Sequence, residues 1–247
     1  MSKEVFNKNE IDNLLGKMQS SQNSEDATDN IFSETLLQQI NKVFSFTCSR
    51  ISEEVISFTR CLCNFSVSAT EELSFDDFCR SIQLNSFNAL YTWDSYPISI
   101  NIDLSVSNAL LISNILDSLT SQFSNRSEEE QKSFEIVKKE FDSILYYDFN
   151  QGYLKTIEQL FSRKILMYFL KDIAIDMGRD VKSKSVFIPR LKKLESNSSW
   201  MKFLPDDERV ILLSVECNIG EEAGFMNICI PNVFIKKLKS MGFLKEE

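Results

Sequence analysis

The chain has 247 residues, of which 43% are hydrophobic, and its formal net charge is −9 at pH 7. This length suffices for roughly one or two domains with a buried core, whereas the acidic balance argues against nucleic-acid binding, which draws its affinity from clustered lysine and arginine. No segment approaches the roughly 18 apolar residues of a membrane span, and the N-terminus has no secretory pattern, so we predict a cytosolic protein without membrane insertion.

Residue types that support catalysis or cofactor binding are scarce. The chain contains no histidine, which excludes Ser-His and Cys-His nucleophile pairs and nearly all catalytic zinc sites. Its six glycines are scattered and form no phosphate-binding loop. We therefore expect no catalytic residue, no metal and no cofactor. The cysteines lie mostly in apolar stretches and are predicted to be buried, reduced thiols: Cys48, Cys61, Cys63, Cys79, Cys217 and Cys229.

The first predicted element is a short amphipathic helix near the N-terminus. Asn7 can cap this helix, and Glu10 completes a capping box. Ile11, Leu14 and Leu15 then fall on one apolar stripe. Because a helix of about three turns is marginal alone, it needs a surface to pack against.

The stretch that follows is almost purely polar. Residues 19–30 contain too little apolar surface to offset the entropy of ordering them, and they are predicted to form a disordered linker. An amphipathic helix on such a linker suits docking into a groove of a partner protein. Alternatively, its apolar stripe folds back onto the core of the protein itself. The residues alone leave both interpretations open.

The next elements alternate between helix and strand. A helical apolar pattern from residue 31 to about residue 62 predicts a long core-facing helix. Residues 64–101 are rich in aromatic and β-branched residues and predict strands, interrupted by a polar segment at 71–77. Residues 105–119 return to a helical pattern.

The second half of the chain ends on a predicted hairpin. Ser127 and Glu130 form a second capping box, which begins a helix that runs to about residue 150. Residues 151–200 are assigned only loosely to helix, strand and loop. Residues 210–219 and 224–230 predict two strands around a glycine-bearing turn, followed by a short final helix. The predicted class is α+β, with long helices packed on a β-sheet in one domain at 31–247, after the tail at 1–18 and the linker at 19–30.

Two segments resemble one known family in the order that the family has them. Residues 7–15 read NKNEIDNLL and are similar to the N-terminal tail of FliM, the flagellar motor switch protein, whose usual form is LSQxEIDALL. Residues 214–231 read SVECNIGEEAGFMNICIP and resemble the hairpin of the FliM middle domain, typically xEVxIGxxxGxxNICIP. The elements between them fit the same middle domain, whose fold is also that of the CheC phosphatases.

This resemblance implies a role in chemotactic motility without catalysis. In the family the tail binds phosphorylated CheY, and the middle domain contacts the rotor protein FliG and neighbouring switch subunits in the C-ring of the flagellar basal body, at the cytoplasmic face of the inner membrane. The implied contacts to the response regulator are Phe6, Glu10, Ile11, Asp12, Leu14 and Leu15.

The sequence departs from the family in three places. A Gly-Gly-x-Gly turn close to the rotor contact is replaced by Asp117, Ser118, Leu119 and Thr120, which remain the candidate rotor contacts although they lack the backbone freedom of glycine. The family continues into a C-terminal domain that pairs with FliN, so we expect FliN not to bind this chain. Residues 163–185 are expected to be an insertion.

Two alternatives to a switch component are considered. CheC and CheX phosphatases, which resemble the FliM middle domain, use a helical Glu-x-x-Asn pair, but here that spacing occurs only in the tail, from Glu4 to Asn7 and from Glu10 to Asn13. The predicted helices at 105–119 and 127–150 lack it, so we expect no enzyme. A free-standing adaptor that binds phosphorylated CheY is the second alternative.

Several polar residues are interpreted as ordinary solvated surface rather than as a site. One set, on the two predicted helices, consists of Asn108, Asn114, Glu135 and Asp142. The other set is the only basic cluster of note in the sequence and consists of Arg190, Lys192 and Lys193. Glu221 and Glu222 are interpreted as turn residues.

Overall fold

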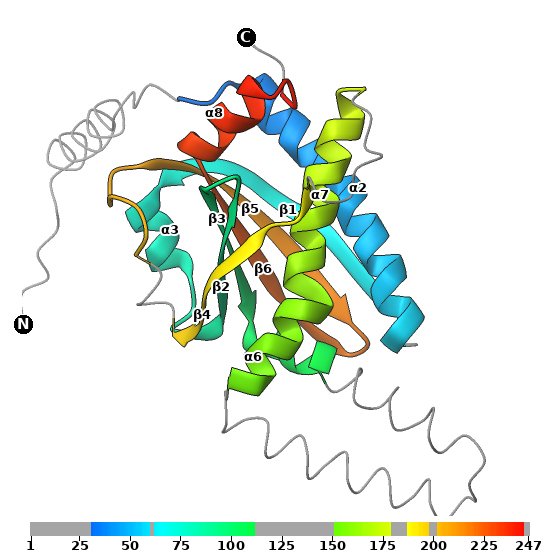
Figure 1. Ribbon diagram of the computed structural model, residues 1–247. Helices are drawn as coiled ribbons and strands as arrows, with labels where there is room; N and C mark the ends of the chain where they lie inside the picture. The colour runs from blue at the N-terminus through cyan, green and yellow to red at the C-terminus, as the bar shows by residue number, and fades with distance from the viewer. Residues whose placement is uncertain (1–30, 60–61, 112–150, 179–186, 198–201, 245–247) are drawn as a thin grey trace, which may run out of the picture. The chain divides into compact units, whose positions relative to one another are not determined.

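The computed structural model describes residues 31–59, 62–111, 151–178, 187–197 and 202–244 (Figure 1). The chain divides into two units, Met1–Ser33 and Glu34–Glu247, and the second contains the sheet and the helices described below. None of the helices in the described ranges is both long enough and apolar enough to span a membrane.

Helices and strands alternate along the second unit. In chain order they are α2 (Glu34–Thr59), β1 (Cys63–Ser74), α3 (Phe75–Ser81), β2 (Asn85–Trp93), β3 (Tyr96–Asp103), α6 (Gln151–Ile157), the π-helical turn η1 (Glu158–Ser162), α7 (Arg163–Asp176), β4 (Arg190–Asn197), β5 (Arg209–Ile219), β6 (Glu222–Pro231) and α8 (Asn232–Ser240). A further helix begins directly after β3 and is described over residues 104–111. The predicted long helix from residue 31, the final hairpin and the final helix are thereby confirmed, whereas the predicted tail helix lies outside the described residues.

The six strands form one antiparallel sheet in the order β1-β5-β6-β3-β2-β4. This order is internally symmetric. If β1 is exchanged with β4, β2 with β5 and β3 with β6, the same order is obtained when the sheet is read from its opposite edge. Each half of the chain therefore contributes one hairpin to the centre of the sheet and one edge strand that pairs with the hairpin of the other half. This arrangement intertwines the two halves, so neither half can form its part of the sheet alone.

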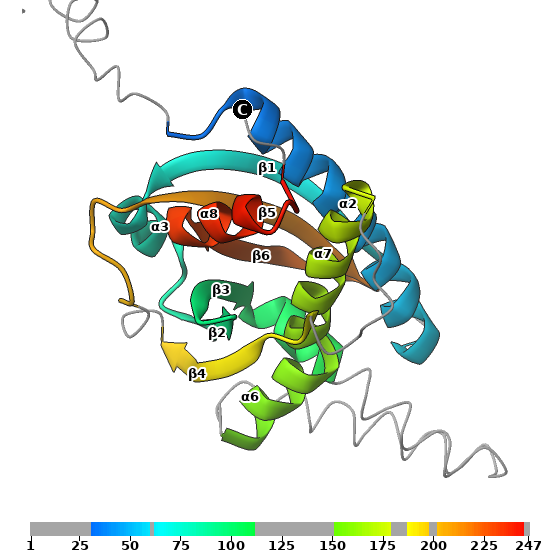
Figure 2. The ribbon, with the colours of Figure 1, turned by 45° about the horizontal axis from the view of Figure 1, so that its top comes forward.

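One face of the sheet is covered by α2, α7 and α8 (Figures 1 and 2). Alternate residues of the central strands point to this face, as Ile98, Ile100 and Ile102 of β3 do, and all three are buried. The helical periodicity of α2 and α7 supplies the facing residues, and the rings of Phe44 and Phe169 lie 5.3 Å apart. This layer is the main hydrophobic core, and burying it is the dominant stabilising contribution.

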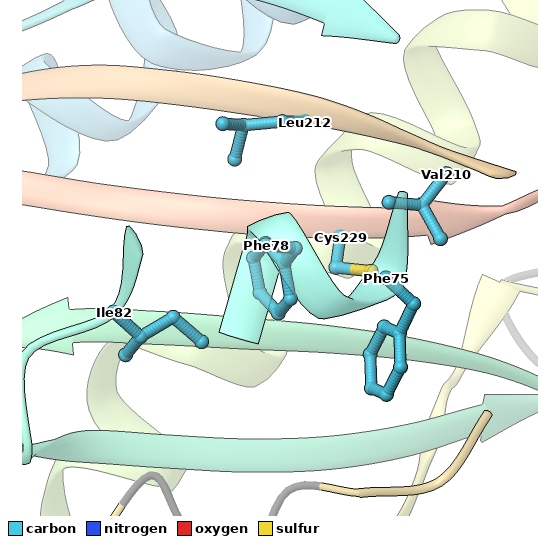
Figure 3. Packing of buried hydrophobic residues seen from close by; sticks show 6 residues of the cluster. All are labelled: Phe75, Phe78, Ile82, Val210, Leu212 and Cys229. Carbon is cyan, nitrogen blue, oxygen red and sulfur yellow. The ribbon is translucent and has the colours of Figure 1, made fainter. Parts of the chain in front are cut away.

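The opposite face is covered in part by α3, whose Phe75 and Phe78 pack on Val210, Leu212 and Cys229 (Figure 3). This helix begins where β1 ends because the Ser74 side chain accepts a hydrogen bond from the backbone N–H of Asp77 at 3.1 Å. A short helix thereby closes one end of this face.

The predicted interruption of the strands at residues 71–77 is placed too early, because only residues 75–77 of it lie outside β1. β1 continues through Ser74, and Glu72 is paired across the sheet with Arg209 of β5 at 2.8 Å. The carboxylate is nearly buried, and the ion pair together with its hydrogen bond allows a charged residue to remain within a strand. Helix α3 then follows directly.

Residues 163–185 were expected to be an insertion, and this expectation is wrong for the part that the structure describes. Residues 163–176 form α7, in which Ile165, Leu166 and Phe169 are fully buried. A helix that supplies the core cannot be an appended segment. Residues 179–186 lie outside the described ranges.

The interpretation of Asn108 as a solvated residue is also wrong, because it is only 9% exposed. Its neighbours Val106, Ala109 and Leu110 are buried as well, so the first turns of this helix are enclosed. Asn114, Glu135 and Asp142 lie outside the described residues, as does the predicted helix at 127–150.

Five of the cysteines can be placed. Cys48, Cys217 and Cys229 are buried free thiols, Cys63 is buried, and Cys79 is partly buried. Burial raises the pKa of Cys48 to about 12, so its thiol stays protonated and unreactive at neutral pH. These residues act as part of the core, as the sequence predicts.

Candidate functional site

The site residues predicted from the tail and from the rotor turn cannot be located in the structure. Phe6, Glu10, Ile11, Asp12, Leu14 and Leu15 lie outside the described residues, and so do Asp117, Ser118, Leu119 and Thr120. What the structure does describe is a helix over residues 104–111, which precede residue 117 in the chain. The start of this helix lies against the β5–β6 hairpin, and the two together form the candidate site.

The hairpin has a two-residue turn that needs a left-handed backbone. Gly220 has a φ of +61°, and its N–H donates to the carbonyl of Leu62 at 2.8 Å. Glycine adopts this φ without steric cost, so the sequence places it where the turn requires it. Glu221 and Glu222 are both exposed; Glu221 lies in the turn, as predicted, whereas Glu222 is the first residue of β6.

Three contacts fix the hairpin to the end of β3 and the start of the helix. The backbone N–H of Phe225 donates to Asp103 Oδ2 at 2.8 Å, and the Ser105 hydroxyl donates to the carbonyl of Ala223 at 3.2 Å. Between them Gly224 approaches so closely that a Cβ atom there would lie 2.7 Å from Ser105 Oγ and 2.9 Å from Val106 Cγ2. We call this arrangement, made by Asp103, Ser105 and Gly224 with its two neighbours, the hairpin latch.

Asp103 is the only ionisable side chain of the latch. Burial raises its pKa, and the hydrogen bond from the Phe225 N–H offsets part of this rise. A buried carboxylate that accepts a backbone N–H has a structural use, because it holds together two segments that are 122 residues apart in sequence.

A shallow pocket of about 370 Å³ opens beside the latch on the face that also carries α3. Ser68, the extra residue of a β-bulge in β1, donates to the carbonyl of Ser214 at 3.1 Å. Ser214 in turn donates to Asn227 Oδ1 at 2.8 Å. Phe225, which is 47% exposed, forms an apolar side of the same pocket next to Asp103.

A row of side-chain amides extends from the pocket across the sheet. Asn227 is in register with Asn101, and Asn101 with Asn88. The Asn101 amide donates to Ser86 Oγ at 2.7 Å and to Asn88 Oδ1 at 2.9 Å. Among the described residues, Asn101 Oδ1 is buried without a hydrogen-bond partner. Ser86, Asn88 and Asn101 are all buried, so this row is an internal polar layer held together by side-chain hydrogen bonds.

The site is suited to non-covalent contacts. It combines an exposed aromatic ring with neighbouring hydroxyl and amide groups on strands that are held rigidly, a combination common in protein interfaces. Within the described residues there is no group of three or more side chains of the types that hold a metal ion.

Sequence reasoning missed the latch although part of its signal is present. Along β3 the polar residues Ser99, Asn101 and Asp103 alternate with isoleucines, which indicates one polar face. That pattern could have identified the face of the sheet that carries the buried polar residues. Only the strand order, however, brings Asp103 next to Phe225.

The fold and the site together define a class of structure, namely a domain of two intertwined halves with one six-stranded antiparallel sheet. The sequence model described as flagellar motor switch protein FliM matches residues 147–245. The FliM of Treponema pallidum (strain Nichols) is 24% identical over 253 residues, which cover 96% of this chain and 65% of that protein. The chain therefore spans slightly less than two thirds of the length of this relative. Over almost its whole length the chain is similar to FliM proteins.

Solved structures agree on the fold. The FliM middle domain from H. pylori superposes with a TM-score of 0.63 at 14% identity and covers 85% of this chain and 99% of that one. A FliM chain from H. pylori in a complex of FliG with FliM gives a TM-score of 0.63 at 15% identity, covering 85% of this chain and all of that one. The predicted fold, a FliM-middle-like α+β domain, is thereby confirmed.

Proposed function

We propose that this protein is a non-enzymatic component of the flagellar motor switch that couples a phosphorylated response regulator to the rotor. The observation that carries the proposal is that the described domain has the FliM middle-domain fold, in a chain whose relatives are flagellar motor switch proteins. Its place would be the C-ring of the basal body, at the cytoplasmic face of the inner membrane.

The rotor protein FliG is the proposed partner of the folded domain. The similar H. pylori FliM is known in a complex with FliG. In this chain the proposed contact is the segment of Asp117, Ser118, Leu119 and Thr120, and the hairpin latch supports it by fixing the start of the preceding helix against the sheet. Neighbouring switch subunits are further proposed partners.

Phosphorylated CheY is the proposed partner of the tail at residues 1–18. Ile11, Leu14 and Leu15 would enter an apolar groove, while Glu10 and Asp12 face basic residues of the partner. Residues 19–30 would act as the linker to the domain at 31–247.

The tail is tested with a labelled peptide of residues 1–18, titrated with phosphorylated and with unphosphorylated CheY. We expect tighter binding to the phosphorylated form. Leu14→Ala should weaken that binding by more than about 1 kcal/mol because it removes a buried anchor, whereas Asn13→Ala should have little effect. Equal binding to both forms, or no binding to either, would contradict the proposal.

The same reagents separate binding from catalysis. When the full chain is incubated with phosphorylated CheY, we expect the phosphoryl group to be lost at the spontaneous rate. The described helices α2, α6 and α7 contain no Glu-x-x-Asn pair. Turnover of phosphorylated CheY above that rate would show that the protein is a phosphatase.

A further inference from the structure

The basic cluster at the start of β4 lies in a groove that the proposed function does not use. The groove has a volume of about 620 Å³ and lies between the β2–β3 turn, β4 and the residue that follows α8. Its lining residues include Trp93, Asp94, Ser95, Ile188, Arg190 and Lys192. We call it the β4 groove.

The charges in the β4 groove do not cancel. Arg190 and Lys192 are both exposed, and the described residues offer neither of them a carboxylate partner. The one acidic residue of the groove, Asp94, is already paired with Lys237 at 2.6 Å. The groove therefore carries two uncompensated positive charges on a chain whose formal net charge is −9.

Local backbone structure fixes the position of these charges. Between Tyr91 and Leu90 of β2 the register of β4 shifts, so that Lys192 is the extra residue of a bulge. Bulges redirect side chains at the edge of a sheet. On the opposite side of the groove, Asp94 and Ser95 have φ values of 48° and 74°. Non-glycine residues adopt these values only at a cost, which the Asp94 ion pair with Lys237 helps to offset.

The groove also has a rigid apolar side. Trp93 is nearly buried and stacks on Phe243 with ring centroids 5.9 Å apart. Phe187 also stacks on Phe243, with ring centroids 6.1 Å apart. Above this aromatic base Ile188 is 46% exposed and offers contact area for an apolar group. The groove thus combines unpaired cations with exposed apolar surface.

We propose that the β4 groove binds an acidic segment of a partner protein in which carboxylate side chains alternate with large apolar ones. Arg190 and Lys192 pair with the carboxylates, and Ile188 with the edge of Trp93 contacts the apolar side chains. Charge complementarity favours this occupant over a neutral one. The proposal does not rest on the role in the flagellar motor.

The test uses the full chain and labelled peptides in fluorescence anisotropy. A peptide that alternates glutamate with leucine is compared with one that alternates glutamine with leucine and one that alternates glutamate with serine. We expect the glutamate–leucine peptide to bind at least tenfold more tightly than either control peptide. Its binding affinity should fall as the salt concentration rises. Absence of binding by that peptide overturns the proposal.

Matched variants assign the binding to the groove. Arg190→Gln with Lys192→Gln should weaken binding at least tenfold, whereas Lys155→Gln with Lys202→Gln makes the same change in net charge at exposed positions outside the groove and should leave binding unchanged. Ile188→Ser should weaken binding of the glutamate–leucine peptide but should leave binding of the glutamate–serine peptide no weaker than before.

Other outcomes contradict the proposal. Equal losses in both charge pairs would mean that the attraction comes from the overall charge of the protein. Displacement of the peptide by inorganic phosphate or by a short RNA at equal concentration would mean a general anion site instead of a peptide groove.

Discussion

The close approach at Gly224 is the sharpest constraint that a single residue places on this structure. Gly224→Ala would bring a Cβ atom within 3.0 Å of Ser105 and Val106, so we expect a loss of about 1–3 kcal/mol in the free energy of unfolding. Gly152→Ala is the matched control, because Gly152 lies exposed in α6. Alanine at that position should raise the free energy of unfolding by about 0.5–1 kcal/mol. Urea unfolding of both variants checks the two signs, and a neutral Gly224→Ala would show that the latch is loose.

Asp103 makes the latch sensitive to pH. Because burial raises its pKa, folded Asp103 keeps its proton to a higher pH than the unfolded carboxyl does. The folded state then binds more protons between the two pKa values, so this residue lowers the free energy of unfolding as pH rises through that window. Asp103→Asn keeps an acceptor for the Phe225 N–H but has no charge to bury.

The pH dependence is therefore predicted for the difference between the two proteins. Below the unfolded pKa, about 3.9, the difference in unfolding free energy between Asp103→Asn and the wild type should be constant. Above that pKa, the unfolding free energy of the variant should rise relative to that of the wild type, and the difference should then level off. Urea titrations at a series of pH values measure this difference. A relative gain by the wild type with rising pH would contradict the assigned direction.

At the scale of elements, antiparallel α2 and α7 are joined by polar contacts of unequal burial. Arg50 pairs with the nearly buried Asp172 at 2.7 Å, and Thr47 donates to the same carboxylate at 2.9 Å. Lys42 pairs with Asp176 at 2.8 Å, but this pair is largely exposed. Glu54 forms a third contact, with Lys164 and Tyr168.

Burial predicts how much each contact contributes. Arg50→Ala leaves the Asp172 carboxylate buried without its cation and should cost about 1–3 kcal/mol, whereas Lys42→Ala should cost less than about 1 kcal/mol because solvent screens that pair. Asp172→Asn in the Arg50→Ala background should restore part of the loss. Thermal or urea unfolding of the three variants measures these changes in unfolding free energy. Equal losses in Arg50→Ala and Lys42→Ala would contradict this ranking.

The elements predicted correctly from the sequence are those with a strong local pattern. The long helix α2 has a sustained apolar stripe, and the β5–β6 hairpin is marked by Gly220 between two apolar runs. The errors came where a distant partner determines the outcome. Glu72 remains in a strand because Arg209 pairs with it, and the Lys-containing segment of α7 is core because α2 and the sheet lie against its apolar side. Strand order, and with it the latch and the β4 groove, has no local signal.

At the scale of the whole molecule, the palindromic strand order explains how the two halves support one surface. The hairpin of the second half is latched to the end of the hairpin of the first, so the helix that starts at residue 104 is held by residues from both. The proposed rotor contact at residues 117–120 follows the described part of this helix in the chain. A rigid support of this kind is what a contact that transmits force requires.

Calorimetric titration of the purified full chain with FliG tests the central claim most directly. We predict saturable binding that weakens at least tenfold in Leu119→Ala, is unchanged in Lys155→Ala, and strengthens when Asp117→Gly, Ser118→Gly and Thr120→Gly together restore the family's turn. If FliG does not bind the chain, or binds it with an affinity that none of the changes at 117–120 alters, the protein does not contact the rotor as we propose.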